Sequence, residues 1–255
     1  MIDINNAKNS FMKYVSDYDN TNPNINRKIY HSLRVMELST QIAKSLNLSN
    51  EEIEIATLIG LLHDIARFYQ FTKYHTFKDR LSIDHGDYGV KILEENNYIR
   101  EFIKTDEYDY IIKKAIKNHN KYKIEDGLDD KTLMFCKIIR DADKLDILYE
   151  GTGIFWNTDE EKREVENTEI SDEYFEKIIK CESIEKNGTT HSKIDTVIFL
   201  MTLIYDINYK YSFEYIINQN LVDGILYRFN YKEDIKIKID AIKNAVMQFI
   251  NNRIA

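Results

Sequence analysis

The sequence predicts an all-α protein, and three observations support this prediction. The chain of 255 residues has one proline and eight glycines, so it contains few of the residues that end helices or form tight turns between strands. Apolar residues recur at spacings of three and four, which is the helical period. Polar caps followed by acidic residues, such as Ser49-Asn50-Glu51-Glu52, mark helix starts. We therefore expect a helical bundle with an additional C-terminal helical region.

The composition argues against several classes of function. Apolar residues make up 43% and charged residues 31%, as in a soluble globular protein that folds by itself. The formal charge of −8 argues against broad binding to duplex nucleic acid, because such binding needs a basic face. No run approaches the roughly 20 apolar residues of a spanning helix, and the N-terminus lacks a signal pattern, so we expect no membrane partner. Cys136 and Cys181 are too few for a disulfide framework, which fits a reducing cytoplasm.

The first half of the chain is expected to be a series of helices. Residues 1–25 form an N-terminal segment with one short helix and a polar loop around Pro23. The next helix, over 27–46, carries His31 on its apolar stripe. A helix over 50–65 is apolar on nearly every side and is therefore expected to lie at the centre of the bundle.

The inner end of that central helix carries a polar pair, His63 and Asp64. Burying such groups without partners is costly. Residues 67–83 then read as a loop rich in aromatic residues and cations, and Asp84 can cap the helix that follows.

Two further predicted helices place polar residues on apolar faces. His85 begins one of them, and His119 ends the next. A helix over 131–148 carries the motif RDADKLD. Within that motif, the residues at helical spacing before Asp143 indicate a slightly more buried face than those before Asp141. Asp143 is therefore the better ligand candidate.

Beyond residue 150 the chain is first charged and loop-like and then helical again. The GTG sequence at 151–153 lacks the preceding strand of a nucleotide-binding fingerprint, so it is interpreted as a turn. Helices are expected near 171–181, 191–208, 212–229 and 232–252. The predicted domains are an N-terminal segment 1–25, a core 26–150 and a C-terminal region 151–255 that packs on the core.

Six polar residues are predicted to share the helical core, and they are His31, His63, Asp64, His85, His119 and Asp143. A single histidine on an apolar face is more often a hydrogen-bonded core residue than a metal ligand. Together, however, these residues would make an improbably polar interior unless a bound ion satisfied them. The set therefore indicates a metal site.

This ordered set resembles the HD superfamily of metal-dependent phosphohydrolases. The similarity covers about residues 27–148 and rests on the contexts HSLRV, LLHDIARF and RDADKLD. It implies that a divalent metal is bound by His31, His63, Asp64 and Asp143. His85 and His119 match positions at which some HD families bind a second metal, whereas other HD hydrolases use such residues on substrate. Imidazole and carboxylate ligands suit Mn, Fe, Ni, Zn or Mg, so the ligands do not name the metal.

The resemblance also implies a reaction and a substrate class. A metal-activated water would attack phosphorus in a small phosphorylated substrate, which we expect to be a nucleotide, and Asp64 would orient or deprotonate that water. Arg67 stands where several HD families carry a cation near the substrate phosphate, and Lys144 is a second candidate. Either cation could instead be a solvated surface charge.

Three alternatives stay open at this point. Some HD proteins with a similar six-ligand set hold two irons and use dioxygen to cleave carbon bonds. A nucleotide-binding sensor without turnover is the second alternative. The third is a helical scaffold that binds no metal. The sequence predicts neither the exact substrate nor the oligomeric state.

Overall fold

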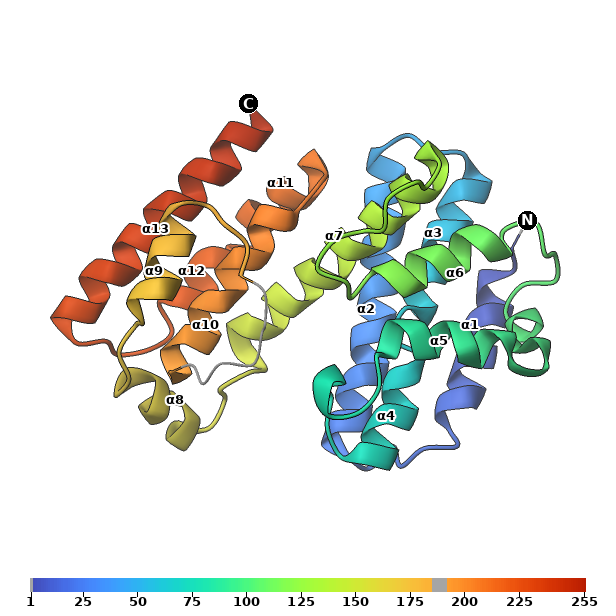
Figure 1. Ribbon diagram of the computed structural model, residues 1–255, viewed down its shortest axis with the longest axis horizontal. Coiled ribbons are helices and arrows are strands. Elements are labelled where there is room, and N and C mark those ends of the chain that lie inside the picture. Colours follow the sequence, from blue (N-terminus) through green and yellow to red (C-terminus); the bar gives the residue numbers. More distant parts are fainter. Residues whose placement is uncertain (1, 185–191) are drawn as a thin grey trace. The chain divides into compact units, whose positions relative to one another are not determined.

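The computed structural model describes residues 2–184 and 192–255, and these residues form helices and connecting loops with no strand (Figure 1). The all-α prediction is confirmed. The α-helices are α1 (Ile4–Val15), α2 (Pro23–Ser45), α3 (Asn50–Leu62), α4 (Ala66–Tyr74), α5 (His85–Glu94), α6 (Asp109–Asn118), α7 (Asp130–Gly153), α8 (Asp159–Glu166), α9 (Asp172–Ile179), α10 (Lys193–Thr202), α11 (Lys210–Asn218), α12 (Leu221–Leu226) and α13 (Glu233–Ile254). The expected start of the helix at residue 191 lies outside the described residues.

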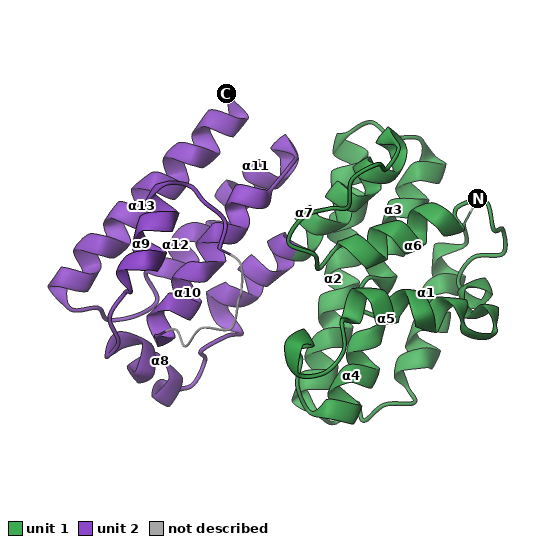
Figure 2. Cartoon of the chain, in the orientation of Figure 1, with its two compact units in different colours: residues 1–143 green, residues 144–255 purple. Residues whose placement is uncertain are grey.

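The chain divides into two compact units, residues 1–143 and 144–255, and the boundary falls inside α7 (Figure 2). The N-terminal unit contains α1 to α6 and the first part of α7. The C-terminal unit contains the rest of α7 and α8 to α13. The domain limits at 25 and 150 stay predictions, as does the packing of the C-terminal region on the core.

The pair α2 and α3 forms the frame of the N-terminal unit. Helix α3 starts at a capping box in which Ser49 and Glu52 satisfy each other's backbone amides, and all its residues from Ile55 to Leu62 are buried, as expected of a central helix. Gly60 permits the close approach of α2, because a Cβ at this position would lie 2.6 Å from Ser39 Oγ and 2.9 Å from the Val35 carbonyl oxygen.

The expected loop over 67–83 is partly wrong, because its first residues belong to α4. Phe68 of this helix is fully buried, and its ring packs edge-on against Phe11 of α1 with centroids 5.8 Å apart. The buried side of α4 also includes the polar residue Gln70. A helix that buries a glutamine lacks the continuous apolar stripe by which helices are recognised in sequence.

The expected turn at 151–153 is also wrong, because these residues are the last of α7. Gly151 instead permits close packing within the C-terminal unit, since a Cβ there would lie 2.5 Å from Leu200 Cδ1. The expected single helix over 212–229 is divided into α11 and α12 by Asn220, whose φ of 50° is left-handed.

Candidate metal centre

The six predicted ligand residues all lie in the N-terminal unit, and the structure brings them together. His63 and His119 directly follow the last residues of α3 and α6, and His85 is the first residue of α5. Because these three side chains stand at helix ends, imidazoles from different helices can meet in one place. Five of the six residues are at most 4% exposed, namely His31, His63, Asp64, His85 and His119.

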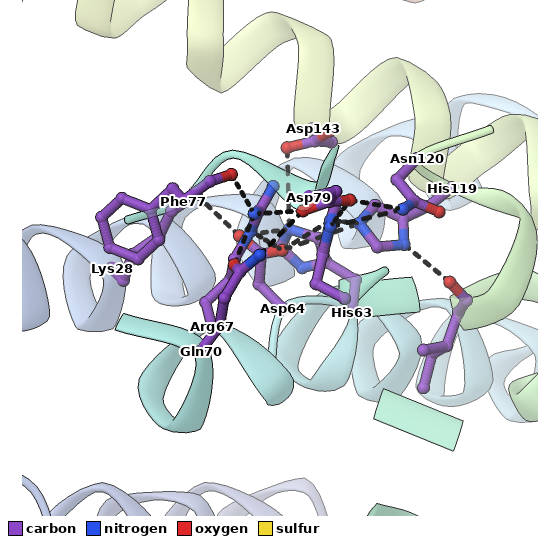
Figure 3. A network of polar contacts seen from close by, with 12 residues as sticks. Lys28, His63, Asp64, Arg67, Gln70, Phe77, Asp79, His119, Asn120 and Asp143 are labelled. Carbon is purple, nitrogen blue, oxygen red and sulfur yellow. Dashed lines mark hydrogen bonds and ion pairs between the residues drawn. The ribbon is translucent and has the colours of Figure 1, made fainter. Parts of the chain in front are cut away.

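One group of ligand atoms, which we call the first lobe, joins α2, α3 and α7 through His31, His63, Asp64 and Asp143. His31 Nε2 lies 3.2 Å from His63 Nε2 and 3.4 Å from Asp64 Oδ2. Asp143 Oδ1 lies 3.2 Å from His31 Nε2 and 3.6 Å from His63 Nε2. The lobe thus gathers two imidazole nitrogens and two carboxylate oxygens. Figure 3 labels three of its residues, His63, Asp64 and Asp143.

A second lobe uses the other oxygen of the same aspartate. Asp64 Oδ1 lies 3.4 Å from His85 Nε2 and 3.6 Å from His119 Nε2. The two imidazole nitrogens of this lobe are 3.0 Å apart. Asp64 therefore belongs to both lobes, with one oxygen in each.

In three of the histidines, Nδ1 points away from the lobes and forms a hydrogen bond with the protein, so that Nε2 faces the lobe. His63 Nδ1 lies 2.8 Å from the Gly60 carbonyl oxygen, and His119 Nδ1 lies 2.6 Å from the Ile116 carbonyl oxygen. His85 Nδ1 lies 2.5 Å from Asp79 Oδ2. Because a carbonyl or carboxylate oxygen can only accept, each Nδ1 carries the hydrogen and each neutral ring directs the Nε2 lone pair into a lobe.

His63 and His85 are neutral at neutral pH. Burial lowers the pKa of His63, although Asp64 and Asp143 act in the opposite direction. Burial, together with the nearby Arg67 guanidinium, lowers the pKa of His85 to about 3. The inward nitrogens therefore act as lone-pair donors and not as positive charges.

This donor set fits a divalent metal. Two nitrogen lone pairs 3.0 Å apart, as in His85 and His119, repel each other unless a cation lies close to both. Ligands at about 2.1 Å from a metal lie about 3.0 Å apart at an octahedral right angle and about 3.4 Å apart at a tetrahedral angle. The separations of the imidazole nitrogens from one another and from the carboxylate oxygens within each lobe, 3.0 to 3.7 Å, cover this range.

Two cations stand beside Asp64, one for each oxygen. Lys28 Nζ donates to Oδ2 over 2.7 Å, and Arg67 Nε donates to Oδ1 over 3.3 Å. Burial raises the pKa of Asp64, but Lys28, His63 and Arg67 outweigh this effect and hold the pKa well below its usual range. Asp64 is therefore ionised at neutral pH.

Arg67, the predicted phosphate contact, is held by four acceptors. Besides Asp64, its Nη1 donates to Gln70 Oε1 over 2.7 Å, to the Phe77 carbonyl over 2.7 Å and to Asp79 Oδ1 over 2.9 Å. Its side chain is 14% exposed. The guanidinium thus lies at the edge of the second lobe in a fixed orientation (Figure 3).

Lys144, the second predicted substrate cation, lies in the C-terminal unit, where its Nζ forms a 2.7 Å ion pair with Asp206 Oδ2. Of Asp141 and Asp143, the two residues of RDADKLD that were compared as ligand candidates, Asp143 is the one in the first lobe. The reason given for choosing it is wrong, however, because Asp141 is fully buried whereas the Asp143 side chain retains 18% exposure.

The sequence interpretation missed Lys28, Gln70 and Asp79. Lys28 could have been found, because it precedes His31 by three residues and therefore shares its helix face. Gln70 follows Arg67 by three residues, but the segment was interpreted as a loop. Asp79 carries no periodic signal, since it lies in the connection between α4 and α5.

The fold and the centre together define a class: an all-helical unit whose histidines and aspartates form a two-lobed site suited to divalent metal. Comparison with family models agrees, because residues 29–148 match the HD domain. The chain therefore contains an HD domain, the domain of a superfamily of metal-dependent hydrolases. No curated protein and no solved structure matches the chain. Among the described helices, none has the length and apolarity needed to cross a bilayer.

Proposed function

We propose that the protein is a divalent-metal-dependent phosphohydrolase that acts on a small phosphorylated substrate, a nucleotide, at the HD-domain centre. The observation that carries the proposal is the combination in one site of two metal-binding lobes and two cations, Lys28 and Arg67. The lobes supply metal ligands, and the cations supply charge for an anionic substrate.

In this proposal the first lobe (His31, His63, Asp64 and Asp143) holds one ion, and the second lobe (Asp64, His85 and His119) holds another. Bound divalent metal would activate a water for attack on phosphorus and neutralise charge on the phosphoryl oxygens.

The chain's own groups orient the reactants. Arg67 has its Nε and Nη1 engaged by the protein, so Nη2 is the nitrogen that would donate to a phosphate oxygen. Lys28 would exchange part of its contact with Asp64 for a second phosphate oxygen. Because Asp64 is ionised, we assign it the role of acceptor that orients the attacking water. A substrate contact by Lys144 stays a prediction, and it would require the ion pair with Asp206 to open.

A second candidate function is supported by the same geometry. Two lobes that share one carboxylate would also suit a di-iron HD oxygenase, which is the alternative that the six-ligand set raises. Iron content together with oxygen-dependent turnover would support the oxygenase. Turnover with Mn²⁺ in the absence of oxygen, and its loss on Arg67→Met, would support hydrolysis.

The direct test is release of phosphate or pyrophosphate by metal-loaded protein from a panel of nucleotides and phosphoesters. We expect His63→Ala to abolish the release, because it removes a first-lobe ligand. His75→Asn is the matched control, since His75 is exposed and its left-handed backbone (φ 54°) tolerates asparagine. The proposal is wrong if the loaded wild-type protein hydrolyses nothing in the panel or if His63→Ala hydrolyses as well as the wild type.

A further inference from the structure

Asp79 contacts both the predicted substrate cation and a predicted metal ligand. Its Oδ1 accepts from Arg67 Nη1 over 2.9 Å and from Gln70 Nε2 over 2.9 Å. Its Oδ2 accepts from His85 Nδ1 over 2.5 Å and from Asn120 Nδ2 over 3.1 Å. One carboxylate therefore receives four donors from α4, from the start of α5 and from the segment after α6 (Figure 3).

The connection between α4 and α5 is built around this carboxylate. Gln70 Nε2 also donates to Ser82 Oγ over 2.8 Å and to the Ile83 carbonyl over 3.1 Å, so this buried residue of α4 holds the end of the connection. Near the beginning of the connection, the Phe77 carbonyl accepts a hydrogen bond from Arg67. The connection that carries Asp79 is therefore held in place at both of its ends by side chains of α4.

The partners of Asp79 are all donors, and this determines what it does. An ionised carboxylate can accept on both oxygens at once, whereas an amide or a hydroxyl cannot. Asp79 is thus an acceptor on both sides.

We propose that Asp79 is a positioning residue that couples the two halves of the candidate site: its Oδ2 keeps His85 in the tautomer that can bind metal, and its Oδ1 holds Arg67 toward the substrate phosphate. The Arg67 half of this inference rests on the proposed phosphohydrolase function. The His85 half concerns metal binding alone and can be tested without turnover.

The variant Asp79→Asn separates the two halves. An asparagine has one acceptor oxygen. The donor pair of Arg67 and Gln70 carries a positive charge, whereas the pair of His85 and Asn120 does not, so the oxygen is expected to face Arg67 and Gln70. The amide NH₂ then faces His85 Nδ1 and can only donate to it. His85 must move its hydrogen to Nε2, the nitrogen that faces the second lobe, and it can no longer bind a metal there.

The metal half is tested by titrating the metal-free protein with Co²⁺ and following absorbance and heat. We expect two equivalents in the wild type and a 10–100-fold weaker affinity for the second-lobe equivalent in Asp79→Asn, with the first unchanged. Asp84→Asn is the matched control. Asp84 contacts the same Asn120 Nδ2, over 3.0 Å, and caps α5, a role that asparagine fills well. Although Asp84 directly precedes His85, none of the described hydrogen bonds joins its side chain to Arg67 or to the His85 ring.

Two results of the titration are informative in different ways. Two equivalents with unchanged affinity in Asp79→Asn would overturn the role of Asp79 and leave the proposed function standing. No Co²⁺ binding by the wild type would overturn both. If Asp79→Asn does not fold, the ¹⁵N shifts of His85 in the wild type decide: a hydrogen on Nδ1 supports the inference, and a hydrogen on Nε2 overturns it.

The substrate half is tested with Asp79→Ala, which removes both acceptor oxygens. On the substrate identified by the panel, we expect KM to rise at least tenfold above that of Asp79→Asn. The same substitution made in an Arg67→Met background should raise KM no further, because the two residues act through one contact. An equal rise of KM in both backgrounds would show that Asp79 does not act through Arg67.

Discussion

At the scale of single residues, Asp64 and Lys28 form the most buried ion pair of the candidate centre. Their side chains are 3% and 11% exposed, and their charged atoms are 2.7 Å apart. A bound divalent ion would neutralise the same carboxylate that Lys28 neutralises. The contribution of bound metal to the free energy of unfolding should therefore be larger when Lys28 is absent.

The first prediction concerns Lys28→Met. In metal-free protein we expect the free energy of unfolding to fall by about 3 kcal/mol, because the change removes the nearer of the two cations beside a buried carboxylate. Added Mn²⁺ should raise the unfolding midpoint of the variant more than that of the wild type, since metal replaces the missing charge. Lys44→Met, an exposed position on the same helix, is the control. Equal midpoint increases in the wild type and Lys28→Met would contradict the prediction.

A second prediction concerns the thiol of Cys136, which is fully buried in the N-terminal unit. Burial raises its pKa from 9.0 to about 12. The unfolded chain thus loses this proton near pH 9 while the folded protein keeps it. The stability that the neutral thiol contributes is fully present below pH 9 and is lost as the pH rises toward 12.

This effect can be measured as the free energy of unfolding in urea at pH 8, 9 and 10. One such group changes the free energy by at most about 1.4 kcal/mol per pH unit. We expect Cys136→Ala to make the decrease between pH 9 and 10 shallower by up to this amount. An identical slope in the wild type and the variant would show that the thiol does not contribute.

Individual residues also show which parts of the candidate site can be predicted from the sequence. His31, His63, His85 and His119 are predicted as a set because each lies on an apolar helix face beside other polar residues. Asp79 is not predicted, because its importance comes from contacts with side chains of three separate segments and not from any period. Asp143 lies in the first lobe although Asp141 is the more buried of the two, so its choice as a ligand candidate rests on the motif.

At the scale of elements, the close contact of α2 and α3 sets the first lobe, because it brings His31 and His63 within 3.2 Å. Gly60 lies at this contact, and its carbonyl oxygen also accepts from His63 Nδ1. The third prediction is that Gly60→Ala lowers the free energy of unfolding by about 2 kcal/mol and weakens metal binding. Urea unfolding and Co²⁺ titration are the measurements.

Gly153→Ala is the control for this prediction. It is also a helical glycine, but a Cβ there meets nothing within 4 Å, so alanine should be neutral or stabilising by up to about 1 kcal/mol. The role of the helix contact would be refuted if Gly60→Ala bound metal with wild-type affinity.

Two of the errors of element prediction share one physical origin. The helix α4 and the end of α7 were interpreted as a loop and a turn, because their sequences contain a buried glutamine and small residues where an apolar stripe is expected. In the structure, Gln70 is satisfied by the connection to α5, and Gly151 gives room for Leu200. These reasons lie in partners distant in sequence, which a local pattern does not contain.

At the scale of the whole molecule, all six predicted ligands lie in the N-terminal unit, and the boundary between the units directly follows Asp143. The fourth prediction is that metal binding increases hydrogen-exchange protection mainly in α2, α3, α5 and α6. Metal at 100 times its dissociation constant stabilises a folded state by about 2.7 kcal/mol. Protection in α13 should change less. A uniform increase over both units would contradict this expectation.

The central claim is that one aspartate, Asp64, joins two metal-binding lobes. The most direct measurement is anomalous scattering from crystals of the protein grown with Mn²⁺. We expect two peaks, one among His31, His63, Asp64 and Asp143 and the other among Asp64, His85 and His119. A single peak at these residues, or Mn²⁺ bound only elsewhere, would show that Asp64 does not join two metal sites.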